Sequence, residues 1–156
     1  MNGSSYGTLI ITLPCTEGIV ICSNKSLNDL NGMVRTDIVK IHQLGRKAAF
    51  SMIGLARADG LPPTLAPAFE PVKTVEFFFA DKNLNYIDRH KEALAKTLEK
   101  AIYATFVTRT GIGTIRPERE ECRVLIWHFD ARSILHGIEI VVEFDSSLIT
   151  RRALSL

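Results

Sequence analysis

Four short apolar runs, rich in β-branched residues and separated by turn-forming residues, occupy the first third of the chain. They span residues 8–13, 18–23, 37–44 and 47–53. The first two flank a short segment that contains Pro14, and they predict a β-hairpin whose second strand is buried on both faces. The other two flank Gly45 and predict a second hairpin, with Lys40 inside its first strand.

The periodicity changes after a proline-rich loop. Apolar positions in residues 72–80, directly after a proline, indicate a short helix, with a strand as the alternative. Residues 88–108 predict a longer helix. Its apolar face comprises Leu94, Leu98, Ala101, Ile102 and Thr105. Two strands follow at 122–129 and 136–144, and the second alternates apolar residues with glutamates, which predicts one face toward water.

Basic and acidic residues nearly balance along the chain. Its 156 residues are 46% apolar and carry 19 Lys and Arg against 17 Asp and Glu, with the two signs interspersed. No basic stripe follows from this pattern, so nucleic acid is not an expected partner. No apolar run approaches the roughly 20 residues that cross a bilayer, and the first residues lack a secretory pattern. We therefore expect a single cytoplasmic domain without membrane contact.

Cysteine and histidine are too scattered to indicate a metal site. Cys15, Cys22 and Cys122 are odd in number and have no metal-ligand spacing, which favours reduced thiols, with Cys22 in the core. The four histidines form no ligand-like pair, and surface or structural roles are expected for them. Trp127 lies in an apolar run and is expected in the core. The sequence therefore predicts neither a metal nor a cofactor.

Thr8 directly follows Gly7 and opens the first apolar run, with Lys40 and Gly54 further along the strand-rich segment. A threonine hydroxyl is a weak nucleophile and needs a base, which its own α-amine supplies once the residue is N-terminal. That amine titrates at about 7.7–8.0, so a useful fraction is neutral near physiological pH. A neighbouring Lys40 ammonium would favour negative charge on the hydroxyl, and the N–H of Gly54 would stabilise an oxyanion.

Each of these residues taken alone has an ordinary structural explanation. A threonine at a strand start is usually a β-former, a strand lysine is usually exposed, and a glycine usually marks a turn or bulge. The joint spacing of Thr8, Lys40 and Gly54 is what indicates catalysis.

Residues 8–59 resemble the β-type subunits of the proteasome and their bacterial relatives. The resemblance is carried by Gly7 and Thr8, Glu17 to Val20, Lys40 and Ile41, and Ile53 and Gly54, with Ala58 and Asp59 as a looser match. It implies a threonine peptidase with an α+β, layered αββα N-terminal-nucleophile hydrolase sandwich. It further implies self-cleavage after Gly7, which would divide the chain into a leader (1–7) and a hydrolase domain (8–156). Peptide or protein substrates and a homo-oligomeric ring are also implied.

Two features depart from the family pattern. Asn24 stands where the family usually has an aspartate, so it can hydrogen-bond Lys40 without holding its charge. The family domain also continues further, and residues 145–156 match none of that later part, so the sandwich is expected to be incomplete at the C-terminal end. The expected catalytic set is Thr8, Lys40, Asn24 and Gly54. A non-catalytic scaffold subunit and a small-molecule amidase on the same fold are the alternatives.

Overall fold

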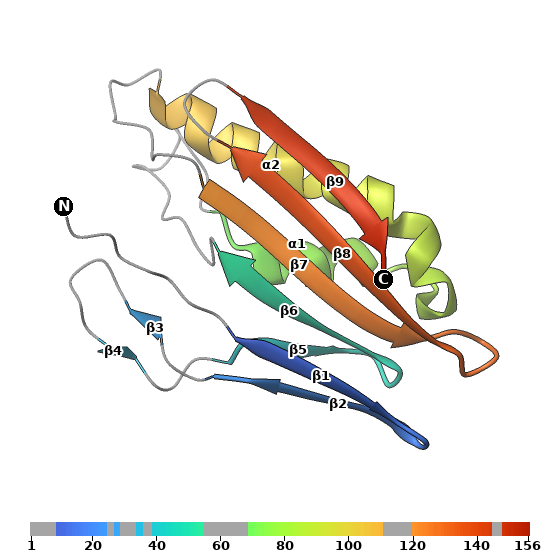
Figure 1. The fold of residues 1–156 in the computed structure, drawn as a ribbon. Coiled ribbons are helices and arrows are strands. Elements are labelled where there is room, and N and C mark those ends of the chain that lie inside the picture. The colour runs from blue at the N-terminus through green and yellow to red at the C-terminus, as the bar shows by residue number, and fades with distance from the viewer. Residues whose placement is uncertain are drawn as a thin grey trace.

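The computed structural model describes most of the chain (Figure 1). The described residues are 9–24, 27–28, 34–35, 39–54, 69–110, 120–144 and 148–156. Gly7 and Thr8, together with the rest of the predicted leader, lie outside them.

A five-stranded antiparallel sheet forms the centre of the fold, in the strand order β5-β6-β7-β8-β9. Its strands are β5 (Ile41–Leu44), β6 (Ala48–Gly54), β7 (Glu120–Phe129), β8 (Leu135–Phe144) and β9 (Ile149–Ser155). The second predicted hairpin is confirmed as β5 and β6, and the two late strands as β7 and β8. Lys40 lies directly before β5 instead of inside a strand, and β9 was not predicted.

Two α-helices and a 3₁₀ helix cover one face of this sheet (Figure 1). They are α1 (Pro71–Phe79), η1 (Leu84–His90) and α2 (Lys91–Thr110). Both predicted helices are therefore confirmed, and Pro71 occupies the first turn of α1, where its missing N–H costs no hydrogen bond. The core lies between α2 and the sheet. It includes Leu94, Leu98 and Ile102 from α2 and Ile138, Ile140, Val142 and Phe144 from β8, all buried.

The first predicted hairpin is confirmed as β1 (Ile10–Cys15) and β2 (Gly18–Ser23), which form a separate two-stranded sheet beside β5 (Figure 1). β3 (Leu27–Asn28) and β4 (Val34–Arg35) form another short pair. The prediction that the second strand is buried on both faces is wrong, because Val20 and Cys22 are exposed. Cys22 is therefore not a core residue.

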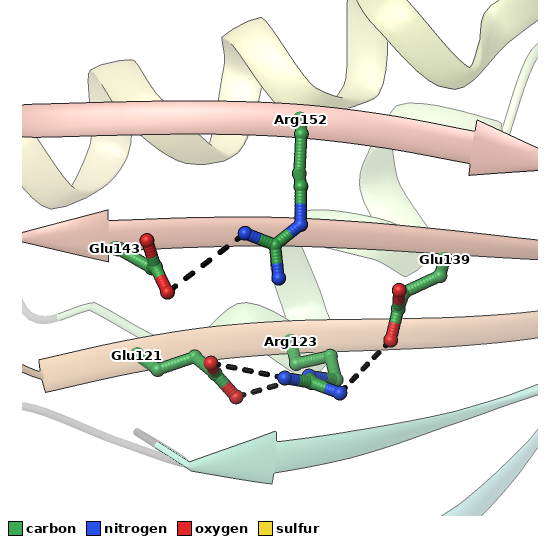
Figure 2. Close-up of polar contacts among 5 residues, drawn as sticks. All are labelled: Glu121, Arg123, Glu139, Glu143 and Arg152. Carbon is green, nitrogen blue, oxygen red and sulfur yellow. Dashed lines mark hydrogen bonds and ion pairs between the residues drawn. The ribbon is translucent and has the colours of Figure 1, made fainter.

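The predicted αββα sandwich is wrong. In the described part of the chain the fold is mostly antiparallel β-sheet, and its helices cover only one face of the main sheet. The opposite face carries five charged residues of β7, β8 and β9, seen in Figure 2 with the helices behind the sheet. They are Glu121, Arg123, Glu139, Glu143 and Arg152. Two sheets pack face to face through apolar residues, and these side chains bind one another instead.

Arg123 is the centre of this ionic network (Figure 2). Its guanidinium donates two hydrogen bonds to Glu121, at 2.9 and 3.1 Å, and a third to Glu139 at 2.9 Å. Arg152 lies 3.8 Å from Glu143. Under these side chains Val141 is only 1% exposed, so the long arginine stems cover apolar surface while their charged ends pair.

No helix in the described ranges has the length and apolar character required to cross a membrane.

Candidate functional site

Asn24 joins the start of β1 to Lys40. It follows the last residue of β2, and its side-chain oxygen accepts hydrogen bonds from the Leu9 N–H at 3.1 Å and from Lys40 Nζ at 3.0 Å. The backbone N–H of Asn24 donates to the Leu9 carbonyl at 3.3 Å. These bonds extend the β1–β2 ladder, in which Ile10 pairs with Ser23, by one more residue pair. One amide oxygen therefore holds the lysine at the beginning of the first strand.

Lys40 reaches this position from the residue directly before β5, and its side chain is buried, with only 7% of the residue exposed. Burial lowers the pKa of the Lys40 ammonium, because removal from water disfavours the charged form. The amide oxygen of Asn24 is neutral, so it orients the ammonium without the charge that an aspartate would supply.

Thr8 lies outside the described residues, but its neighbour Leu9 does not. The Leu9 nitrogen belongs to the peptide bond that joins Thr8 to Leu9. The Leu9 N–H and the Lys40 ammonium donate to the same side-chain oxygen of Asn24, at 3.1 and 3.0 Å. The Leu9 and Lys40 nitrogens are therefore separated by a single oxygen atom. The described geometry thus brings the Lys40 ammonium close to the peptide bond that follows Thr8.

Gly54 closes β6 in a conformation that only glycine adopts easily. Its φ is +80°, and a β-carbon built on it would lie 2.1 Å from the carbonyl oxygen of Glu121 in β7. The close contact between β6 and β7 is therefore sufficient to require a glycine here. That the Gly54 N–H also donates to an oxyanion remains a prediction.

Lys40 and Gly54 come to the same end of the main sheet. Ile41, the first residue of β5, pairs with Ser51 of β6, and Lys40 directly precedes Ile41. Gly54 follows Ser51 by three residues, which is about 10 Å along a strand. Of the predicted catalytic set, the structure brings Lys40 and Asn24 together. The parts that Gly54, Thr8 and the Gly7 cleavage site take in the site stay predictions.

The sequence interpretation missed a stacked histidine pair at the opposite end of β7 and β8, in which His128 is buried and His136 is partly exposed. His128 and His136 are direct partners in the ladder, and their rings stack with centroids 5.1 Å apart. Their positions near the facing ends of two consecutive strands are visible in the sequence, but their pairing depends on the strand register. No three His, Cys, Asp or Glu side chains gather closely enough to hold a metal ion in the part of the chain that the structure describes.

No family model, curated protein or solved structure matches this chain. Functional inference therefore depends on the geometry of the residues themselves.

Proposed function

We propose that the chain is a threonine-type peptidase whose nucleophile is Thr8, exposed as the N-terminal residue by self-cleavage after Gly7. The observation that carries this proposal is the shared oxygen of Asn24, which accepts from both the Leu9 N–H and the Lys40 ammonium. A buried cation held beside the peptide bond that follows a candidate nucleophile is an arrangement that activates a hydroxyl. The proposal concerns this chemistry and does not require an αββα sandwich.

In the proposed reaction the Thr8 hydroxyl attacks the carbonyl carbon of a peptide bond. The free α-amine of Thr8 accepts the hydroxyl proton and passes it to the amine that leaves, so that an ester to Thr8 remains. Water then hydrolyses the ester, with the same amine accepting its proton. The Lys40 ammonium favours the developing negative charge, and the Gly54 N–H donates to the oxyanion of each tetrahedral intermediate.

Intact-mass measurement of the purified full chain tests the proposal. Self-cleavage predicts a mature mass that lacks residues 1–7, and an electrophile that reacts with N-terminal threonine should add one mass increment that maps to Thr8. The variant Thr8→Ala should retain the leader and add nothing. Thr12→Ala is the matched control, because Thr12 is a second threonine a few residues further along, in β1, and its replacement should leave processing unchanged.

Lys40→Met separates the chemistry from the fold, because methionine has a similar length and no charge. Loss of one electrostatic contact in an acyl-transfer site costs about 100-fold in rate, and peptide hydrolysis by this variant should fall by at least that factor. A wild-type chain that keeps residues 1–7 and does not react with the electrophile would refute the proposal.

A non-catalytic subunit of a homo-oligomer is the second candidate. It is favoured by the neutral partner of Lys40, Asn24, and by an exposed apolar face on the first hairpin. That face comprises Leu9, Ile11, Leu13, Val20 and Cys22. An apolar face of this kind is usually covered by a partner. For such a subunit, Thr8→Ala should leave assembly and cellular phenotype unchanged, whereas the peptidase requires loss of function.

A cytoplasmic location belongs to the same proposal. Cys15 and Cys22 are exposed as free thiols, and exposed thiols persist in a reducing compartment. Peptides or unfolded protein segments are the proposed substrates, and short amides tested beside them separate a peptidase from a small-molecule amidase.

A further inference from the structure

His128 is buried without any hydrogen-bond partner for its ring. It is 2% exposed, and neither ring nitrogen has a partner among the described residues. Its one face stacks on the His136 ring at an interplanar angle of 18°. A neutral imidazole leaves one donor and one acceptor unsatisfied in this place, whereas an imidazolium would leave two donors and a full charge.

The charged groups around His128 are already engaged with other partners. From β8, His136 Nε2 lies 3.2 Å from Asp130 Oδ2, and the other oxygen of Asp130 accepts the N–H groups of Arg132 and Ile134. Opposite His128 on β6 stands Ala48, which carries no charge. The carboxylate of the β7–β8 turn is therefore committed to the turn itself and to His136.

A second carboxylate that acts on His128 is Asp88 of η1, whose charge raises the pKa of the ring. Asp88 accepts a hydrogen bond from Ser155 at 3.0 Å and lies 3.5 Å from the Lys91 ammonium. Lys91 also donates to Ser155. This group of three side chains fastens the end of β9 to the junction of η1 and α2. Asp88 is thus paired with Ser155 and Lys91, and it makes no hydrogen bond to the ring nitrogens of His128.

The balance of these groups keeps His128 neutral. Burial is the largest influence and lowers the pKa of His128, and the neighbouring His136 lowers it further, while Asp88 and Asp130 raise it by less. A positive charge on the His136 ring, which stacks on His128, disfavours a second positive charge on the His128 ring.

We propose that His128 is an acid-sensitive latch that releases the end of the β7–β8 pair from η1 when its ring takes up a proton. The proton comes from the solvent once the ring leaves the core, and the protonated ring cannot return without burying an unpaired charge. The released segment comprises the ends of β7 and β8, with the turn between them. The Asp88–Ser155 contact loses its support at the same time, so the end of β9 is released with it.

The sign of the pH dependence follows from proton binding. The pKa of His128 in the fold lies below its ordinary value of 6.5, so the open state binds one more proton than the closed state in that interval. The closed state is fully favoured above pH 6.5 and loses this advantage as the pH falls toward the lowered pKa. Within that window the opening equilibrium should rise as the pH falls, by at most about tenfold for each pH unit.

Hydrogen exchange by mass spectrometry on the full chain tests the latch. After correction for intrinsic exchange, the amides of 124–129 and 135–140 should exchange faster at pH 5.5 than at pH 6.5, by up to about fivefold. His128→Phe keeps an aromatic ring and cannot titrate, so its segments should show no such increase. His42→Phe is the matched control, because His42 also stacks on an aromatic ring, that of Phe50, but lies in the edge strand β5. It should leave the acid response of β7 and β8 unchanged.

Two results would overturn the latch. One is an equal acid response in His128→Phe, and the other is no acid response in the wild-type chain. If His128→Phe does not fold, the imidazole nitrogen resonances of the wild-type protein decide. The latch requires that the His128 ring stay neutral until the segment opens, so a ring that titrates normally while 124–129 remain protected would refute it.

Discussion

The α-carbon of Gly54 lies so close to the backbone of Glu121 that a β-carbon at this position would be 2.1 Å from the Glu121 carbonyl oxygen. This contact occurs where β6 ends against β7, with Gly54 opposite Cys122 in the ladder. The positive φ of Gly54, +80°, adds a second reason for a glycine. The position that the sequence interpretation assigns to oxyanion binding therefore also has a demanding structural role.

Replacement of Gly54 by alanine should destabilise the fold by about 2–4 kcal/mol, from the left-handed backbone and the backbone overlap together. Urea unfolding followed by circular dichroism measures this change. Gly18→Ala is the control, because a β-carbon at Gly18 meets nothing within 4 Å. Its free energy of unfolding should change by less than about 1 kcal/mol. Equal effects for the two variants would contradict the contact.

Replacement of Asn24 by aspartate should stabilise the protein by about 1 kcal/mol near neutral pH. A carboxylate can still accept from Leu9 and Lys40, and its bond to the ammonium is charge-assisted where that of the Asn24 amide oxygen is not. Thermal or urea unfolding at pH 7 measures the difference. The variant Asn24→Leu has a similar size and lacks the acceptor, so it should be less stable than the wild-type protein.

Lys40 should give the stability of the wild-type chain a recognisable dependence on alkaline pH. Its pKa in the fold is lowered from 10.5, so the unfolded state binds more protons between the lowered value and 10.5. The free energy of unfolding contributed by Lys40 therefore rises with pH across that window. Unfolding measured at several alkaline pH values should show this rise in the wild-type protein and not in Lys40→Met. Parallel profiles for the two proteins would contradict the burial of the charged group.

Replacement of Arg123 by leucine should cost about 1–2 kcal/mol, because Glu121 and Glu139 lose their charge-assisted hydrogen bonds on the partly buried face of the sheet (Figure 2). Arg132→Leu is the matched control. The Arg132 side chain is 80% exposed and lies 3.8 Å from Asp130, so its loss should change stability by less than about 0.5 kcal/mol. Urea unfolding of both variants in the same buffer makes the comparison, and a neutral Arg123→Leu would show that the network is not stabilising.

Local periodicity was sufficient to predict most of the helices and strands. The helical spacing in α2 and the alternation in β8 depend on residues a few positions apart, and both are confirmed. β9 was missed because Ile149–Ser155 contains two adjacent arginines and little apolar alternation. It forms a strand because β8 offers it a complete antiparallel ladder, which is a tertiary interaction.

The errors concern how elements pack, which local patterns do not determine. The apolar run of β2 was expected to be buried on both faces, yet Val20 lies on an exposed hairpin face. The alternating glutamates of β8 indicate a polar face, whereas the family resemblance implies a layered αββα sandwich, which the described part of the chain does not form. At the candidate site, the spacing predicts that Lys40 lies beside Thr8. The structure places the Lys40 ammonium on the Asn24 oxygen that also binds the Leu9 N–H, and the contact with Thr8 itself stays a prediction. The His128 and His136 contact requires the register of β7 against β8, which the sequence alone does not give.

The three cysteines should differ sharply in reactivity. Cys122 is fully buried in β7 beneath the helices, and burial raises the pKa of its thiol to about 12. Because the thiolate is the reactive form, alkylation of this residue at pH 8 requires unfolding. Cys15 and Cys22 are exposed and should react in the native protein. Mass spectrometry after brief treatment with iodoacetamide should therefore show two additions, and three after treatment in urea.

Modification of Cys122 as fast as Cys22 in the native protein would contradict the position of β7 in the core. An unreactive Cys22 in the native protein would instead indicate that a partner covers the apolar face of the first hairpin.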